Sequence, residues 1–485
     1  MNILPQVSAF LSQHPIPNLI DGRDVSSPNV KPVFNPADAS ILTHVTWGGE
    51  KEIDLAADAA KRAFPVWASM PVAERAALLH RWADAMEKNA FALAQIETLD
   101  VGKAISASEA FDIPFGIEGL RYFANLSVNA SYDTPLALRH IEARVHRSPF
   151  GVCGFIFPWN FPFDLLMWGV TPALAAGNTV VVKPSEVTPL STLFAAKLAL
   201  EAGIPPGVIN VVVGNGPGAG AALTAHPAIR RMSFTGSPEA GAIVGEACGR
   251  RIIPCKLELG GKGAAVVFAD ADVEAAGTKL AAAITLNTGQ VCCTATRWIV
   301  QESIYDQFVE SARAALQATK IGIGLDRETQ MGPLVSETQR ERVLSYYERG
   351  IANGARPVLA AAKSLEPGYF VHPWLLEGDP DNVCFREEIF GPAAFLTKFR
   401  DESAAIEMIH SVDYGLANSV WTSDLAKANR FAEDMLVGNT WINAHNVFAY
   451  GLPYGGINRS GMGGGVNSPA TFYDYLRDHT IARPL

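Results

Sequence analysis

The sequence predicts an α/β protein with more than one domain, and three observations point to this class. Alanine-rich segments with apolar residues at helical spacing fill residues 50–125, short β-branched runs then alternate with helical segments, and a second series of this alternation begins after residue 260. Strands and helices that alternate at this length typically form βαβ units around a mostly parallel sheet. A chain of 485 residues also exceeds what one hydrophobic core usually supports.

The elements of the first series follow in a regular order. Residues 52–70 and 72–100 place apolar side chains three or four positions apart, which predicts helical segments. The β-branched runs within 178–183, 207–214 and 230–236 predict strands, and each is followed by a helical segment. We expect these units to form the first sheet.

A second series predicts a second α/β domain. It follows residues 257–272 and continues through 296–318 and 386–399. Alternating polar and apolar residues in 139–156 predict an extended hairpin, and residues 471–481 alternate in the same way and are suited to pair with a sheet edge. Unpaired strands at both places would favour subunit association, and ordinary intrachain edge strands explain the pattern equally well.

The charge pattern excludes several classes of protein. The net charge of −10 is spread along the chain without a basic stripe, so nucleic acid is not an expected partner. The N-terminus lacks the cationic start of a signal peptide, and no apolar run approaches the roughly 20 residues that cross a bilayer. The sequence therefore predicts a cytoplasmic protein with no membrane partner.

The six cysteines are too sparse for a disulfide framework, and they form no CxxC pair and have no accompanying histidines typical of zinc. We therefore expect no metal. Cys292 and Cys293 are adjacent in "NTGQVCCTATR", after a glycine and a glutamine. Either one is a candidate nucleophile, although a buried, unreactive cysteine is the commoner case.

Two glycine-containing turns are candidate anion sites. "GNGPGAG" (214–220) lies between a strand and a helix, as a dinucleotide fingerprint does, but glycines are common in such turns for backbone conformation alone. In "FTGSPEAG" (234–241) a helix starts at Ser237 or Pro238 after Gly236, so its free N–H groups can face an anion. By itself this turn is also an ordinary helix cap.

Two polar side chains stand out for acid–base or oxyanion chemistry. The prolines of "FPWNFP" restrict the backbone around Asn160, whose amide can then donate to an oxyanion or bond its own turn. Glu258 lies in the apolar run "LELGGK", where burial would raise the pKa of its carboxyl group toward the range of a general base. A salt-bridged structural glutamate is the more frequent occupant of such a position.

Together the motifs resemble one family. "FPWNFP", "KPSE", "FTGS", "LELGGK", "GQVC", "EEIFGP" and "LPYGG" followed by "RSG" resemble the motifs of the NAD(P)-dependent aldehyde dehydrogenase superfamily, nearly from end to end. The resemblance implies a homodimer or homotetramer with an aldehyde dehydrogenase-like fold. Its expected parts are a Rossmann-type cofactor domain (1–129 and 149–260), an α/β catalytic domain (261–470) and a small oligomerisation sheet (130–148 and 471–485).

The resemblance assigns the nucleophile to Cys292, the cysteine after Gly-Gln-x, and makes Cys293 a neighbour. Its thiolate attacks an aldehyde carbon to give a thiohemiacetal, which loses hydride to become a thioester. Asn160 matches the family's oxyanion donor and Glu258 the base that activates water to hydrolyse the thioester. We therefore expect an NAD-dependent oxidoreductase that converts an aldehyde to a carboxylic acid. The alternatives are a coenzyme A-acylating or reductive relative and a non-catalytic NAD-binding protein of the same fold.

The resemblance also implies a cofactor cleft. Lys183 and Glu186 match positions that hold the adenosine ribose, and Glu388 and Phe390 match those at the nicotinamide ribose. The other matched cofactor positions are Ile156, Trp159, Ser185, Gly216, Phe234, Gly236, Ser237 and Leu259. A carboxylate at Glu186 repels a 2′-phosphate, so NAD is favoured over NADP, which binds only where that side chain swings away.

The substrate tunnel of the family is matched by Phe161, Leu165, Trp168, Phe448 and Tyr454. An aromatic funnel of this kind favours apolar or aromatic aldehydes and also suits a quaternary ammonium group. The absence of arginine and lysine from these positions disfavours a carboxylate-bearing semialdehyde. At least one of the aromatic residues is expected merely to pack.

Two departures from the family pattern concern the general base. Many relatives carry Arg-Glu where this chain has Gly464 and Gly465, and a lysine where it has Gly169. We therefore expect water or backbone groups to serve Glu258. Without a nearby cation the pKa of its carboxyl group should be higher.

Overall fold

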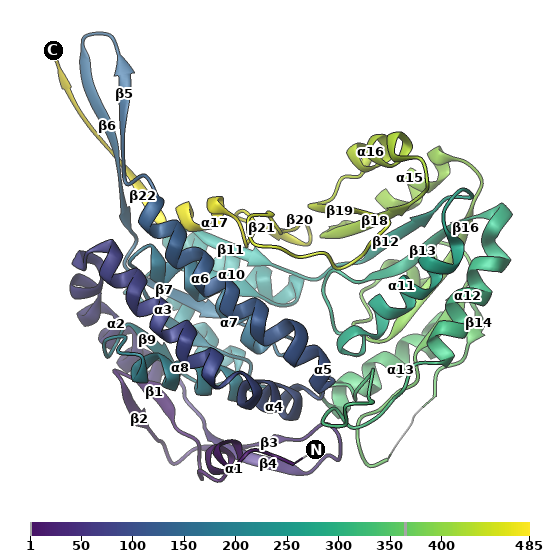
Figure 1. Cartoon of the computed structure of the whole chain (residues 1–485), viewed down its shortest axis with the longest axis horizontal. Coiled ribbons are helices and arrows are strands. Elements are labelled where there is room, and N and C mark those ends of the chain that lie inside the picture. The colour runs from purple at the N-terminus through teal and green to yellow at the C-terminus, as the bar shows by residue number, and fades with distance from the viewer. Residues whose placement is uncertain (1, 363–365) are drawn as a thin grey trace.

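The computed structural model describes residues 2–362 and 366–485. Two large sheets lie side by side with helices around each, and a narrow three-stranded arm projects from the first sheet (Figure 1). The α/β class predicted from the sequence is confirmed.

The first sheet has a parallel centre. In spatial order its strands are β2 (Arg23–Val25), β1 (Asn18–Ile20), β9 (Ile209–Val211), β8 (Thr179–Lys183), β7 (Val152–Ile156), β10 (Ile229–Thr235), β11 (Cys255–Glu258) and β21 (Gly461–Met462). The strands from β9 to β11 run parallel, so their carboxyl ends meet at one edge. β1, β2 and β21 add antiparallel pairs at the two sides.

Helices cover both faces of this sheet. One face packs against α7 (Pro162–Ala175) and α8 (Leu190–Glu201), behind which α3 (Val72–Lys88), α4 (Ala90–Val101) and α6 (Ile113–Asn129) belong to the same core. The other face packs against α2 (Glu50–Ser69), α9 (Ala221–Ala225) and α10 (Pro238–Arg251). Val180 and Val182 belong to the first core and Val181 to the second. Since both faces are buried, "TVVVK" is a continuous apolar run rather than an alternating one.

Short elements complete this half of the chain. They are α1 (Pro5–Leu11), the hairpin β3 (Val30–Phe34) and β4 (Ile41–Thr46), α5 (Ile105–Ala107), and two π-helical turns at Ser108–Asp112 and Gly216–Gly220. The second of these turns follows β9, as expected for "GNGPGAG".

The second sheet is built in the same way. In spatial order its strands are β14 (Arg356–Leu359), β15 (Trp374–Glu377), β16 (Ala393–Phe399), β13 (Ala295–Gln301), β12 (Gly263–Val267), β18 (Ala417–Trp421) and β19 (Asn439–Ile442). Its helices are α11 (Val273–Thr285), α12 (Tyr305–Gln317), α13 (Glu337–Ala352), α14 (Val383–Arg386), α15 (Glu402–His410) and α16 (Leu425–Asp434). Short 3₁₀ turns lie at Leu286–Gly289 and Glu302–Ile304, and β17 (Tyr414–Gly415) pairs with β20 (Ile457–Asn458).

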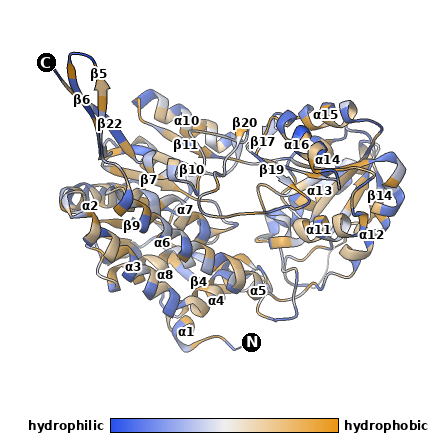
Figure 2. Ribbon diagram, turned by 45° about the horizontal axis from the view of Figure 1, so that its top comes forward, coloured by the Kyte–Doolittle hydropathy of each residue, from blue (hydrophilic) through white to orange (hydrophobic). Residues whose placement is uncertain are grey.

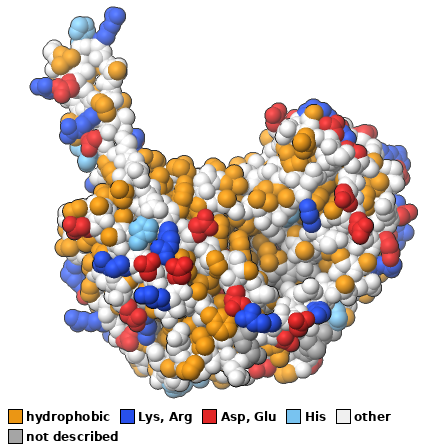
Figure 3. Space-filling view, in the orientation of Figure 1, with side chains coloured by type: hydrophobic (Ala, Val, Ile, Leu, Met, Phe, Trp, Pro, Cys, Tyr) orange, Lys and Arg blue, Asp and Glu red, His pale blue; other side chains and the backbone are white. Residues whose placement is uncertain are grey.

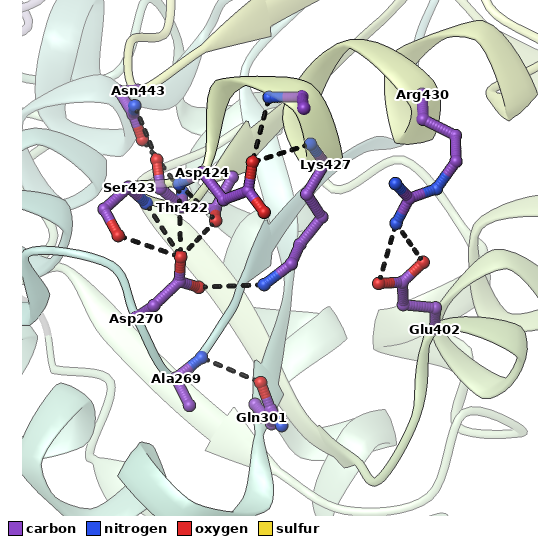
Figure 4. Close-up of polar contacts among 11 residues, drawn as sticks. Ala269, Asp270, Gln301, Glu402, Thr422, Ser423, Asp424, Lys427, Arg430 and Asn443 are labelled. Carbon is purple, nitrogen blue, oxygen red and sulfur yellow. Dashed lines mark hydrogen bonds and ion pairs between the residues drawn. The ribbon is translucent and has the colours of Figure 1, made fainter.

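A carboxylate network ties two parts of the second sheet together (Figure 4). Asp270, in the turn after β12, accepts hydrogen bonds from Thr422 Oγ1 at 2.7 Å and from Ser423 Oγ at 2.9 Å, and Lys427 Nζ of α16 lies 3.3 Å from its other oxygen. Burial opposes ionisation of Asp270, but these hydrogen bonds outweigh it and hold the pKa of the carboxyl group below its ordinary value. Asp270 is therefore a charged structural group.

The arm consists of β5 (Asp133–Leu138), β6 (Ile141–Pro149) and β22 (Leu476–Pro484), with β6 in the centre. β22 pairs antiparallel with β6 along its whole length, from Leu476 opposite Pro149 to Pro484 opposite Ile141. The predicted C-terminal strand starts later than residue 471, because α17 (Pro469–Tyr473) occupies the first part of that segment.

The arm carries apolar side chains that the chain leaves uncovered. Leu138, Ile141 and Ile481 are 52%, 41% and 40% exposed. Figure 2 shows apolar residues along β5, and Figure 3 shows apolar side chains between the charged ones on this face of the arm. Within the described residues, the helices are all too short or too polar to cross a membrane.

Candidate active site

A cavity of about 640 Å³ opens where loops of the two sheets meet. It is lined by residues that follow β7 and β10 of the first sheet and by residues that precede β13 and β16 or follow β19 of the second. Cys292, Cys293, Asn160 and Glu388 are among its lining residues.

The loop that carries Cys292 has a constrained backbone. Asn287, Thr288 and Gly289 have φ angles of 45°, 56° and 70°, in the left-handed region that non-glycine residues rarely adopt. Gln290 holds this loop, because its Nε2 donates to the Asn287 carbonyl at 3.0 Å and its Oε1 accepts from the Val335 amide at 3.0 Å. The backbone thus fixes the direction of the thiol that follows.

The two adjacent thiols differ. Cys292 is partly exposed and its Sγ lies 3.4 Å from the Tyr454 hydroxyl, whereas Cys293 is 1% exposed and its Sγ donates to Asn446 Oδ1 at 3.4 Å. A hydrogen bond with Cys293, helped by Tyr454, lowers the pKa of Cys292 against the effect of burial. The same hydrogen bond and burial raise the pKa of Cys293. Cys292 is the better thiolate.

Asn160 lies next to this loop. Pro162 opens α7, and Asn160, two residues earlier, is 4% exposed. Its Nδ2 donates to the Gln290 carbonyl at 3.0 Å, and its own carbonyl accepts from Asn287 Nδ2 at 2.8 Å. One of its two amide hydrogens therefore joins the loops, and Asn160 is also one of the residues that line the cavity.

Glu258 ends β11 behind the cavity wall. Its side chain is buried, and neither carboxylate oxygen has a hydrogen-bond partner among the described residues. Burial, opposed by Lys256 and supported by Cys292, raises the pKa of Glu258 to about 8. The expected rise in pKa is present, but the expectation that no cation is near Glu258 is wrong, because Lys256 lies two residues before it on the same strand.

The presence of glycine at position 169 has a steric reason. A Cβ atom added there would lie 2.6 Å from the Phe157 ring. The space where a basic side chain was expected from the family resemblance is therefore occupied by the Phe157 ring.

The matched cofactor residues fall into two groups. Trp159, Gly236, Ser237, Leu259, Glu388 and Phe390 line the cavity. Ile156, Lys183, Ser185, Glu186, Gly216 and Phe234 do not line it and lie at or near the carboxyl ends of β7, β8, β9 and β10, along the same edge of the sheet.

Each of these two groups includes one carboxylate, Glu388 in the cavity and Glu186 at the edge of the first sheet. Glu388 Oε1 accepts from the Gly261 amide at 2.9 Å, and burial raises the pKa of Glu388 to about 7. A Cβ at Gly260 would lie 2.3 Å from Glu388 Oε2, so only glycine allows this approach. Glu186 is 34% exposed and pairs with Lys183 Nζ at 3.2 Å.

The matched substrate residues form one aromatic wall of the cavity. Phe161, Leu165, Trp168, Phe448 and Tyr454 all line it. Ring centroids of Trp168 and Tyr454 are 5.6 Å apart, and those of Phe448 and Tyr454 are 5.4 Å apart. Phe161 also contacts the buried Lys103, whose Nζ lies 4.1 Å from the ring centroid.

Sequence reasoning missed several residues of the site. Phe111, in the π-helical turn before α6, lines the cavity, and the centroids of the Phe111 and Phe448 rings are 5.9 Å apart. A helical pattern gives no signal for such a turn. The sequence could have identified Lys256 as a neighbour of Glu258, because alternation along a strand places residues 256 and 258 on one face. His445 bonds the Cys293 carbonyl through its Nε2 at 2.9 Å, and burial lowers its pKa to about 4.

Comparison with known proteins gives consistent matches. The model of the aldehyde dehydrogenase family matches residues 24–481. Phenylacetaldehyde dehydrogenase of Pseudomonas fluorescens is 37% identical over 473 residues, which cover 95% of this chain and 94% of that protein. The NAD+ complex structure of an aldehyde dehydrogenase from Bacillus cereus has a TM-score of 0.97 at 36% identity and covers 100% of this chain and 99% of its own. The structure of betaine aldehyde dehydrogenase of Staphylococcus aureus in complex with NAD+ has a TM-score of 0.95 at 31% identity. The match covers 99% of this chain and 97% of that chain.

Proposed function

The chain belongs to the aldehyde dehydrogenase family and oxidises aldehydes with NAD, and from this premise we propose that Cys292, Asn160 and Glu258 carry the reaction to a carboxylic acid. The observation that supports the proposal is that Cys292 and Asn160 line one cavity and that Glu258 lies close behind its wall. Asn160 and the Cys292 loop share the Gln290 carbonyl, and Glu258 lies near enough to Cys292 for their charges to interact.

The first step uses Cys292 and Asn160. The thiolate attacks the aldehyde carbon, and the free amide hydrogen of Asn160, with the backbone N–H of Cys292, stabilises the alkoxide that forms. Loss of one such donor typically costs about 3 kcal/mol of barrier. Cys293 is a structural neighbour that lowers the pKa of the nucleophile.

The cofactor residues fit a dinucleotide. Ser237 caps α10 and leaves N–H groups at the helix start, and Glu388 presents a carboxylate at the cavity. NAD, when bound there, would supply the hydride acceptor that oxidation of the thiohemiacetal to a thioester needs. We propose that Glu388 and Phe390 hold the nicotinamide ribose and that Lys183 and Glu186 hold the adenosine ribose. The partly exposed carboxylate of Glu186 would repel a 2′-phosphate, which favours NAD over NADP.

Glu258 completes the reaction as a general base. Its carboxylate takes a proton from water, the hydroxide attacks the thioester carbon, and the C–S bond breaks to return the Cys292 thiolate. A base with a pKa of about 8 is well matched to this task near neutral pH.

The aromatic wall supports apolar or aromatic aldehydes as substrates. Trp168, Phe448 and Tyr454 present rings to the cavity beside Cys292, and no cationic side chain belongs to this wall. A quaternary ammonium aldehyde is the second candidate, because the same rings suit cation–π attraction.

We propose that the chain forms a homodimer or homotetramer through the arm. Its three strands expose Leu138, Ile141 and Ile481, which a second copy would cover.

The proposed domains are 1–129 with 149–260 for the cofactor, 261–470 for catalysis, and 130–148 with 471–485 for association. β21 is an exception in this division, because residues 461–462 pair with the first sheet. The cytoplasmic location stays a prediction.

A panel of aldehydes tests the function. Aliphatic, aromatic, semialdehyde and trimethylammonium aldehydes are mixed with NAD or NADP, and NADH absorbance and the acid product are measured. We expect apolar and aromatic aldehydes with NAD to be best, Cys292→Ser to be inactive and Cys293→Ser to retain turnover. Activity that survives in Cys292→Ser and disappears in Cys293→Ser would show that Cys293, not Cys292, is the nucleophile. A product that forms only with coenzyme A would show that the thioester is consumed by acyl transfer and not by hydrolysis.

A further inference from the structure

Strand β11 presents two ionisable side chains on one face. Lys256 and Glu258 are two positions apart, so their side chains point to the same side of the sheet. Leu257 points to the opposite side and packs in the core against α10. Both Lys256 and Glu258 are buried.

Lys256 is held by two oxygen atoms. Its Nζ donates to the Gly465 carbonyl at 2.6 Å and lies 2.8 Å from Asp474 Oδ2. The Lys256 side chain is 1% exposed, whereas that of Asp474 is 32% exposed. The ion pair therefore leads from the interior beside Glu258 to the protein surface.

A run of glycines makes room for this arrangement. A Cβ at Gly463 would lie 2.5 Å from the Cys255 carbonyl, and one at Gly464 would lie 3.0 Å from Asp474 Oδ2. A Cβ at Gly455 would lie 2.7 Å from the Gly465 Cα and 3.3 Å from Glu258 Oε1. The carbonyl that anchors Lys256 thus belongs to backbone that passes beside the Glu258 carboxylate.

Few charges face the two residues. Glu258 interacts electrostatically with Lys256 of its own strand and with Cys292 from the loop before β13. Lys256 interacts with Asp474 from the end of α17, with Arg231 of β10 and with Glu258. Arg459, between β20 and β21, is instead paired with Glu239 at the surface. Lys256 is therefore the cation that interacts electrostatically with the Glu258 carboxylate.

We propose that Lys256 is a positioning residue for thioester hydrolysis: its ammonium group, anchored by Asp474 and by the Gly465 carbonyl, favours the ionised, proton-accepting form of the Glu258 carboxylate. The inference rests on the proposed function. In each turnover Glu258 takes one proton from water as the C–S bond is replaced by a C–O bond, and it must lose that proton before the next turnover. The ammonium group of Lys256 favours this loss, because it stabilises the carboxylate that results.

The test measures the pH dependence of thioester breakdown after the NADH burst, by acid quench, in the full chain. Removal of the cation in Lys256→Met should move the midpoint of the rise in rate to higher pH by about one unit. Removal of the counter-ion in Asp474→Asn should move it to lower pH, because the charge of Lys256 is then less neutralised. Lys320→Met removes a surface cation that pairs with Glu328 and should leave the midpoint unchanged.

Opposite shifts in the two ion-pair variants support the proposal, and so does either shift alone if the other variant fails to fold. Equal losses of rate at every pH, with the midpoint unmoved, would show a merely structural ion pair and overturn it. The NADH burst separates this failure from failure of the proposed function. A burst in the unchanged chain shows that thioester formation proceeds, and a missing burst there would refute the proposed function itself.

Discussion

Two carboxylates near the ends of strands in the two sheets show opposite environments. Asp270, after β12, accepts hydrogen bonds from Thr422 and Ser423 and pairs with Lys427 (Figure 4). Glu258, at the end of β11, has no hydrogen-bond partner among the described residues and is more deeply buried. The pKa of Asp270 is lowered and that of Glu258 is raised to about 8. A carboxylate with saturated hydrogen bonds serves stability, whereas one without partners keeps a proton affinity suited to catalysis.

The largest expected difference between these two acids is kinetic. Glu258→Gln should slow steady-state turnover by about 10² to 10⁴, the usual contribution of a general base, and leave the NADH burst in place. Asp270→Asn, the matched control, should change turnover little. Stopped-flow absorbance measures both phases. A Glu258→Gln variant with normal turnover would remove Glu258 from the mechanism.

The pH profile sharpens the comparison. Because Glu258 accepts a proton only when ionised, thioester hydrolysis should rise with pH up to about 8 and fall by about tenfold per unit below it. Asp270→Asn should show the same profile as the unchanged chain. A rate of hydrolysis that is flat between about pH 6 and 9 would contradict the assigned base.

Stability should depend on pH with opposite signs at the two acids. The folded-state pKa of Glu258 lies above its ordinary value of 4.5, so its ionisation destabilises the fold as pH rises from there to about 8. Each pKa unit is worth about 1.4 kcal/mol, so Glu258→Gln should gain a few kcal/mol at pH 8 and little at pH 4. Urea unfolding at both pH values measures this difference. An equal gain at the two values would mean that ionisation of Glu258 is not responsible.

The smallest effect is expected at Asp270. Its depressed pKa stabilises the fold above the ordinary value of 3.8 and loses this contribution as pH falls below it. The side chain is 34% exposed and screened by solvent, so Asp270→Asn should cost about 1 kcal/mol at pH 7. Denaturant unfolding, with Glu402→Gln in a nearby surface ion pair as the control, tests the value. A loss no greater than that of the control would show that the network in Figure 4 adds little.

Much of the fold was predictable because its signals are local. Helical spacing predicted α2, α3 and α4, and β-branched runs that alternate with helical segments predicted β8, β9 and β10. The family resemblance, which supplied the activity and the cofactor, is confirmed. The starting point of β22 was predicted too early, because "TFYDY" alternates like a strand although Pro469 and Ser468 open a short helix there.

The missed parts of the site depend on contacts between distant segments. Phe111 reaches the cavity because a π-helical turn interrupts the helical pattern, and nothing local predicts that turn. Lys256 was overlooked because its partners, Gly465 and Asp474, lie more than two hundred positions away. Strand alternation alone would have placed Lys256 beside Glu258, although it would not have identified what holds the ammonium group.

The glycines at 463–465 limit what laboratory evolution can do with this enzyme. Gly463 and Gly464 have φ angles of 90° and 83°, and a Cβ at Gly465 would lie 2.4 Å from the Tyr454 carbonyl. Libraries that randomise these codons should return mostly glycine among active clones. An acidic or basic side chain at these positions would be strained, so adaptation of the hydrolytic step to a new working pH should come through other positions.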